Sequence, residues 1–366
     1  MRPELIDKKT NKNGEDHCPI PTWVVFNSND NSPNLANNKD INMENYLREN
    51  FPKFYDNFEL TDYIGSNFGN FIYTGRTKNN ADKNLYSFKF SIQNNKSAKK
   101  SKESYREIYY QKNSHHINIS QILAFYKIKE QDFFTVSEFG AFGHLDNFLN
   151  KFLKRKVVSE TFINFIAKQI LEGINYEHIN QKILYLNMKE DNIIIQPNLI
   201  IKLQGFSSSI SFKGYKPNDI IKLKRKGIDR YMAPEIINGE QIEVRYGTKI
   251  DVYSLGVILY KLAFGFYPKG LSEIKEDEED KMIKAINNPS LEFPKSMEIS
   301  GKFKSFLEHL LEKDYKKRYS IKDALNDPWI KGWDIINEEK ENTGIMDYFF
   351  ERLLNNNIPG FNRYIK

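Results

Sequence analysis

The sequence predicts an α+β protein in which a strand-rich first part is followed by a larger helical part. From Phe58 onward the chain contains short apolar runs, and residues 133–139 have the continuous apolar character of a buried strand. Residues 158–178 instead predict a long amphipathic helix, with apolar side chains at helical spacing: Phe162, Phe165, Ile166, Ile170, Leu171 and Ile174. A chain of 366 residues can bury one large core or two lobes.

A third observation makes the fold more specific. Residues 185–192 read YLNMKEDN, and residues 205–207 read GFS after an apolar run. The two segments resemble the catalytic loop and the metal-binding Asp-Phe-Gly tripeptide of eukaryotic protein kinases. Further segments resemble that superfamily, namely YMAPE at 231–235, DVYSLG at 251–256, DYKKR at 314–318 and DPWI at 327–330. The resemblance covers residues 57–331 and implies a bilobal kinase-like fold, with a small β-rich lobe at 57–139 and a helical lobe at 140–331.

Composition narrows the class of protein. The chain is 40% hydrophobic and 28% charged, which is typical of globular proteins. Cys18 is the single cysteine, so an intramolecular disulfide is excluded and a reducing compartment is expected. The net charge is +6, but no nucleic-acid-binding motif accompanies it. The most apolar stretch, 253–267, contains Lys261 and is too short to span a bilayer. We therefore expect a cytoplasmic protein with no nucleic-acid partner and no membrane segment.

Residues 1–56 are predicted to form a polar, asparagine-rich extension. They have few periodic apolar positions and cannot bury enough surface to fold alone. One apolar island, PIPTWVVF at 19–26, interrupts this composition. The island is either a sticky patch on a free tail or the anchor of an extended arm that docks on the protein itself or on a partner.

Residues 58–73 resemble the kinase Gly-rich loop with its two flanking strands. If Gly69 is the third glycine of that loop, Gly65 is out of phase with the family pattern. Phe71 then lies where the family has a small valine over the adenine ring. Its side chain either fills the adenine site or packs into the small lobe.

Two charged residues of the small lobe match the family pair that positions ATP. Lys89 ends a strand at 85–89, and Glu107 lies near the start of a helical stretch that precedes HINI at 116–119. The resemblance implies that Lys89, Glu107 and the loop residue Asn192 form a vestigial ATP site of weak affinity.

The residues that would perform the chemistry are replaced. Asn187 occupies the position of the catalytic aspartate, and its neutral amide cannot accept a proton. Gly205 occupies the position of the metal-binding aspartate and has no side chain, so no metal site is expected. Leu186 replaces the loop arginine that would receive a phosphorylated activation segment.

The residues that hold the fold are retained. Glu235 and Arg318 match a family ion pair, and Asp251 is expected to cap a buried helix and hold the loop backbone. After the kinase-like region, residues 332–366 form a tail in which apolar residues recur at helical spacing between 345 and 354.

The residues that would perform the chemistry are replaced, while the residues that hold the fold are retained. This combination predicts a non-catalytic pseudokinase that acts as a scaffold or structural component of a protein assembly. Its protein partners are expected to bind residues 19–26 and 345–354, in a cytoplasmic setting of cytoskeletal or ciliary type. One alternative is a divergent protein kinase or kinase-fold transferase with residual Ser/Thr phosphotransfer through Asp191 or Glu190. Another alternative is a nucleotide-sensing switch. We expect no cofactor, apart from weakly bound ATP.

Overall fold

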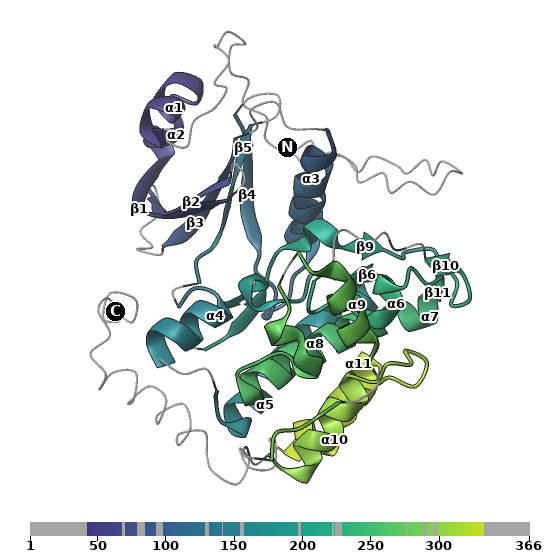
Figure 1. Cartoon of the computed structure of the whole chain (residues 1–366). Helices are drawn as coiled ribbons and strands as arrows, with labels where there is room; N and C mark the ends of the chain where they lie inside the picture. The colour runs from purple at the N-terminus through teal and green to yellow at the C-terminus, as the bar shows by residue number, and fades with distance from the viewer. Residues whose placement is uncertain are drawn as a thin grey trace.

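The computed structural model describes residues 42–332, apart from gaps at 68–69, 79–84, 93–97, 129–131, 141, 154–156, 197–198, 222, 224–228, 276, 289–290, 296 and 298. A small lobe built on a β-sheet stands over a larger helical lobe, as the sequence predicts (Figure 1). Both apolar segments predicted to bind partners, 19–26 and 345–354, lie outside the described residues.

The small lobe contains a five-stranded antiparallel sheet in the order β1-β2-β3-β5-β4. Its strands are β1 (Phe58–Asn67), β2 (Asn70–Thr77), β3 (Tyr86–Ser91), β4 (Ile122–Lys127) and β5 (Phe133–Glu138). Side chains alternate across each strand, so β3 buries Phe88 and Phe90 while Ser87 and Lys89 point the opposite way. The helix α3 (Ala98–Asn113) lies beside this sheet (Figure 1).

Two short helices before the sheet belong to the small lobe. They are α1 (Met43–Asn50) and α2 (Phe54–Asn57), and α1 begins at Asn42, whose side chain accepts a hydrogen bond from the Asn45 backbone N–H (3.1 Å). Leu47 and Phe54 are fully buried in a cluster with the phenylalanines of β3 and β5. The folded lobe therefore includes residues 43–56, the end of the segment predicted to be an extension.

The large lobe is helical, with short two-stranded sheets near its upper surface. Its helices are α4 (Leu145–Asn147), η1 (Phe148–Leu153), α5 (Glu160–Tyr176), η2 (Glu177–Gln181), η3 (Glu190–Asn192), η4 (Phe206–Ser208), α6 (Pro234–Ile237), α7 (Val244–Gly247), α8 (Lys249–Phe264), η5 (Pro268–Glu273), α9 (Glu279–Asn287), α10 (Gly301–Leu310) and α11 (Ile321–Asn326). The strand pairs are β6 (Ile183–Leu184) with β9 (Ile210–Ser211), β7 (Ile193–Ile195) with β8 (Ile201–Leu203), and β10 (Ile220–Ile221) with β11 (Ile242–Glu243).

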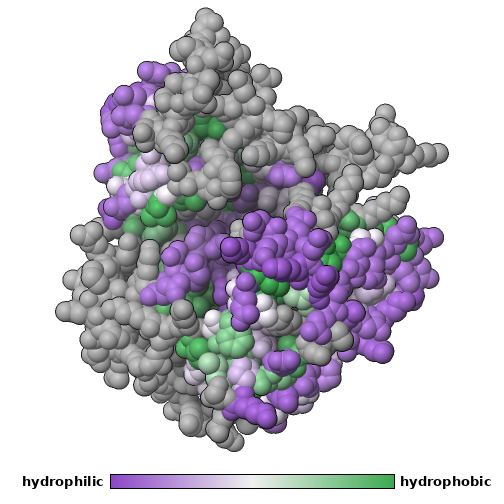
Figure 2. Space-filling model, in the orientation of Figure 1, coloured by the Kyte–Doolittle hydropathy of each residue, from purple (hydrophilic) through white to green (hydrophobic). Residues whose placement is uncertain are grey.

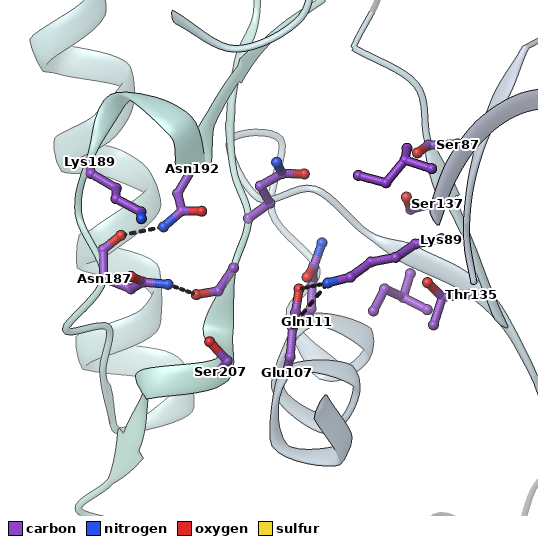
Figure 3. A pocket seen from close by; sticks show the side chains of 14 residues that line it. Ser87, Lys89, Glu107, Gln111, Thr135, Ser137, Asn187, Lys189, Asn192 and Ser207 are labelled. Atoms are coloured by element: carbon purple, nitrogen blue, oxygen red, sulfur yellow. Dashed lines mark hydrogen bonds and ion pairs between the residues drawn. The ribbon is translucent and has the colours of Figure 1, made fainter. Parts of the chain in front are cut away.

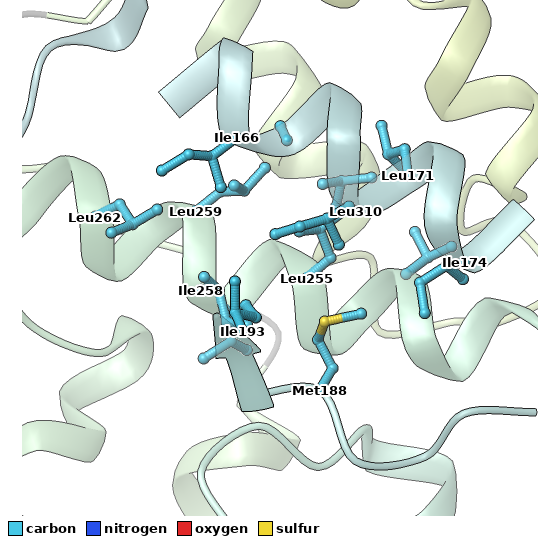
Figure 4. Packing of buried hydrophobic residues seen from close by; sticks show 14 of the residues in the cluster. Ile166, Leu171, Ile174, Met188, Ile193, Leu255, Ile258, Leu259, Leu262 and Leu310 are labelled. Carbon is cyan, nitrogen blue, oxygen red and sulfur yellow. The ribbon is translucent and has the colours of Figure 1, made fainter. Parts of the chain in front are cut away.

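Helix α8 is the centre of the large lobe. Nearly all of its residues are buried, because α5 and α10 both pack against it (Figure 4). A Cβ at Gly256 of α8 would come within 2.9 Å of the Leu310 Cβ, so glycine permits the close approach of α8 and α10. The predicted helix at 158–178 is confirmed as α5 followed by the first residues of η2.

Within the described part of the chain, no helix combines the length and the apolar character needed to cross a membrane.

Candidate functional site

A cavity of about 330 Å³ lies between the two lobes (Figure 3). Side chains from β2, β3, α3, β4 and β5 line it on the small-lobe side, and residues of the loop 185–192 and of 204–207 line it on the other. The lining residues are Ile72, Ser87, Lys89, Glu107, Gln111, Ile122, Thr135, Ser137, Asn187, Lys189, Asn192, Gln204, Gly205 and Ser207. The structure thus brings together all the predicted site residues except Leu186.

Lys89 and Glu107 form an ion pair across the small lobe. The Lys89 Nζ lies 3.0 and 3.1 Å from the two carboxylate oxygens of Glu107. The pair joins β3 to α3, and both side chains are only partly exposed. The charge of Lys89 is therefore neutralised within the protein.

Hydrogen bonds to a buried carboxylate hold the catalytic-loop segment in place. The Asp251 carboxylate, in the first turn of α8, accepts hydrogen bonds from the backbone N–H of Tyr185 (2.9 Å) and of Leu186 (2.7 Å). The imidazole of His178 contacts the same carboxylate at 2.8 Å. Leu186 has φ +58, a left-handed backbone conformation that these hydrogen bonds hold.

Amide hydrogen bonds occupy the place where the catalytic and metal-binding acids would act. The Asn187 Nδ2 donates to the Gly205 carbonyl (2.5 Å), and the Asn192 Nδ2 donates to the Asn187 carbonyl (2.7 Å). Gly205 has φ +82, and an added Cβ would come within 2.6 Å of the Asn192 Oδ1. The backbone conformation and the packing at this position therefore both favour glycine.

The cavity does not fit a magnesium site. Magnesium in proteins is bound mainly through carboxylates, and Glu107, the one carboxylate among the described lining residues, is already paired with Lys89. Among the described residues no group of three or more His, Cys, Asp or Glu side chains could hold a metal ion.

The two acids considered as replacements point away from the cavity. Glu190 is buried, lies 3.0 Å from the Lys261 Nζ and accepts a hydrogen bond from the Tyr231 hydroxyl. The Asp191 side chain is 66% exposed and lies 3.9 Å from the Lys189 Nζ. Neither carboxylate lines the cavity.

Phe71 packs into the small lobe, and Ile72 lines the cavity instead. The two residues alternate along β2, so only one of them can face the cavity. In the observed register Gly65 pairs with Ile72, and Asn67 pairs with Asn70. The sequence alignment predicted Phe71 over an adenine ring, but the residue that faces the cavity is its neighbour Ile72. The predicted alignment is therefore wrong by one residue.

The polar inner wall of the cavity was not predicted from the sequence. Ser87, Thr135 and Gln111 line it beside Ser137, the residue at the end of the predicted buried strand. Their signal in the sequence was the alternation along 85–89 and 133–138, which interleaves hydroxyl residues with phenylalanines. Predicting that these residues line one cavity also requires the pairing of β3 with β5, which the sequence pattern alone does not specify.

A family model described as the protein kinase domain matches residues 58–330. The chain belongs to this family. It is 28% identical to the calcium-dependent protein kinase 4 of Plasmodium falciparum, over 89% of this chain and 59% of that protein. It is also 28% identical to the serine/threonine-protein kinase 36 of Mus musculus and to the serine/threonine-protein kinase TIO of Arabidopsis thaliana. These matches cover 81% and 75% of this chain but only 21% and 19% of the relatives.

Two further contacts hold the activation segment of this kinase domain. Arg318 donates to both carboxylate oxygens of Glu235, at 2.6 and 2.9 Å, and both side chains are buried. Leu186, at the position of the loop arginine, packs against an apolar cluster that contains Ile221 and Val244. The Leu186 side chain therefore contributes an apolar contact here.

Proposed function

We propose that this kinase domain is a non-catalytic pseudokinase that serves as a scaffold or structural component of a protein assembly. The observation that carries the proposal is the absence of a carboxylate at Gly205, where an added Cβ would come within 2.6 Å of the Asn192 Oδ1. In phosphoryl transfer most of the catalysis is electrostatic stabilisation, to which the metal contributes strongly.

The missing general base adds a second loss. Asn187 donates its amide to the Gly205 carbonyl and has no group that accepts a proton at neutral pH. General acid–base catalysis contributes about 10²–10⁴-fold to a rate, so this loss alone would slow transfer by a large factor.

The second candidate is a divergent protein kinase with residual Ser/Thr phosphotransfer. The names of the relatives favour it, because they are called serine/threonine or calcium-dependent protein kinases. The positions of Glu190 and Asp191 argue against it, since one is buried in an ion pair and the other is exposed outside the cavity. A nucleotide-sensing switch is supported only by the intact pair of Lys89 and Glu107.

The scaffold role requires a binding surface. The apolar segments 19–26 and 345–354 remain our candidates, because a few apolar anchors can dominate the energy of an interface. In this proposal the protein belongs to a cytoplasmic assembly of cytoskeletal or ciliary type.

Truncation tests the scaffold role. The shortened proteins should lack residues 1–41 or 333–366, which leaves α1 and the rest of the described core intact. We expect each to keep the melting temperature of the full chain and to lose partners in co-purification from cell extract. If both truncated proteins retain every partner, the arms are not the binding surface.

A further inference from the structure

The turn that follows α6 contains an asparagine and then a glycine. Asn238 is the residue at the C-terminal end of α6, Gly239 follows it with φ +66, and both are exposed. Asparagine is among the thermally labile residues of proteins, and a following glycine increases its lability because it has no side chain to hinder attack on the asparagine amide. A Cβ added at Gly239 would meet no heavy atom of the described chain within 4 Å beyond its own neighbours, so the turn has room to change conformation.

Hydrogen bonds engage both reacting groups of this turn. The Asn238 Nδ2 donates to the Asn287 Oδ1, and the Asn287 Nδ2 donates to the Asn238 Oδ1, both at 3.0 Å. This amide pair joins the end of α6 to the last residue of α9, and the two helices are neighbours in the large lobe (Figure 1). The Gly239 backbone N–H donates to the Ile236 carbonyl (3.1 Å). Both contacts must open before the Gly239 nitrogen reaches the Asn238 side chain.

We propose that Asn238 is a site of spontaneous deamidation and that Asn287 controls its rate. In the reaction the Gly239 nitrogen loses its proton to hydroxide and bonds to the Asn238 Cγ, and the side-chain nitrogen leaves as ammonia. Water then opens the five-membered succinimide ring at either of its carbonyls, which yields aspartate or isoaspartate. The net change is the addition of water and the loss of ammonia, so the step needs no oxidant, metal or cofactor.

The aspartate product breaks half of the amide pair. An ionised carboxylate only accepts hydrogen bonds. At position 238 it still accepts from the Asn287 Nδ2, but it no longer donates to the Asn287 Oδ1. The link between α6 and α9 then depends more on the apolar cluster beneath it, which contains Ile237, Met282 and Ile286.

The isoaspartate product has the larger effect, because it adds a methylene group to the main chain. Across this turn the Glu240 backbone N–H donates to the Glu235 carbonyl (2.9 Å). The side chain of Glu235 is the buried partner of Arg318. A longer main chain between Glu235 and Glu240 displaces this hydrogen bond and loosens the segment that holds the ion pair. Chemical ageing of an exposed turn thereby reaches a buried contact of the large lobe.

Incubation of the full chain at mildly alkaline pH, followed by proteolysis and mass spectrometry, tests the proposal. We expect the peptide that contains Asn238 to gain the mass difference between asparagine and aspartate, in both product forms. Asn287→Ala should raise the rate about threefold or more, because it removes the amide pair. Asn326→Ala is the matched control, since Asn326 is an exposed asparagine at the end of α11 that bonds within its own helix, and it should leave the rate unchanged. An unmodified Asn238 in both the natural protein and Asn287→Ala would overturn the proposal, and equal rates in the two would refute the role of Asn287.

A stability measurement tests the structural consequence. Asn238→Asp reproduces the aspartate product without isoaspartate and should lower the melting temperature. The aged natural protein, which also contains isoaspartate, should unfold at a still lower temperature. Asn238→Gln, aged in parallel, corrects for changes elsewhere in the chain, such as at Asn13, which also precedes a glycine. If the aged natural protein with a modified Asn238 melts no lower than aged Asn238→Gln, the turn does not transmit its modification to the buried ion pair.

Discussion

At Gly205 the backbone conformation and the nearest side chain both disfavour a larger residue. The left-handed backbone conformation disfavours most side chains, and an added Cβ would come within 2.6 Å of the Asn192 Oδ1, so the Asn192 side chain would have to shift. An alanine at this position therefore meets both backbone strain and the Asn192 side chain.

This packing predicts the effect of alanine at Gly205. Gly205→Ala should lower stability by more than Gly214→Ala, although both residues have positive φ, at +82 and +89. Gly214 has open space around its position, so alanine there costs only the backbone strain, on the order of 1 kcal/mol. Urea denaturation of both variants measures the difference. Equal losses would show that the Asn192 contact is relieved without cost.

Glu177 predicts a dependence of stability on pH. Burial raises the pKa of its carboxyl to about 8, the Ser114 hydroxyl opposes the shift, and Asp251 adds to it. A raised folded-state pKa contributes stability that is complete below the ordinary value of 4.5 and is lost as pH rises towards 8. Glu177→Gln should therefore gain stability over the natural protein by up to about 1.4 kcal/mol per pH unit in this window. Denaturation at pH 5, 6.5 and 8 measures the gain, and a constant difference would contradict the assignment.

At the scale of elements, the bidentate pair of Arg318 and Glu235 ties the loop after α10 to α6. Removing one partner strands a buried charge, so Arg318→Ala should cost about 3–5 kcal/mol. The exposed pair of Arg245 and Glu243, at 2.7 Å, is the matched control, and Arg245→Ala should cost at most about 1 kcal/mol. Chemical denaturation compares the two variants, and equal costs would mean that the buried pair contributes no more than a surface one.

Sequence motifs predicted the lobes and most of the site, because spacing fixes position along a loop or helix. Asn187, Asn192 and Gly205 meet at the cavity as their spacing implies. Helix α1 was not predicted, because most of its residues, MENYLREN, are polar. Its helical pattern is apparent only from the side chains that the structure buries in the small lobe. The position of Ile72 and the pairing of Ser87 with Ser137 depend on strand register, which single strands do not specify.

At the scale of the whole molecule, contacts across the lobes need no nucleotide. Lys202 of β8 lies 2.8 Å from the carboxylate of Glu138 at the end of β5. The Asn118 amide, between α3 and β4, donates to the Ile201 carbonyl (2.9 Å). These two contacts join the lobes, while the Asp251 hydrogen bonds hold the catalytic loop within the large lobe.

A radiolabel transfer assay tests the proposal that this kinase domain does not transfer phosphoryl groups. The natural protein, the Asn187→Asp variant and the Lys89→Ala variant are incubated with labelled ATP, magnesium and manganese, and with a peptide substrate. We expect no incorporation into peptide or protein for any of the three, because Asn187→Asp still leaves the metal unheld at Gly205. Incorporation by the natural protein or by Asn187→Asp that persists through purification and is absent with Lys89→Ala would contradict it.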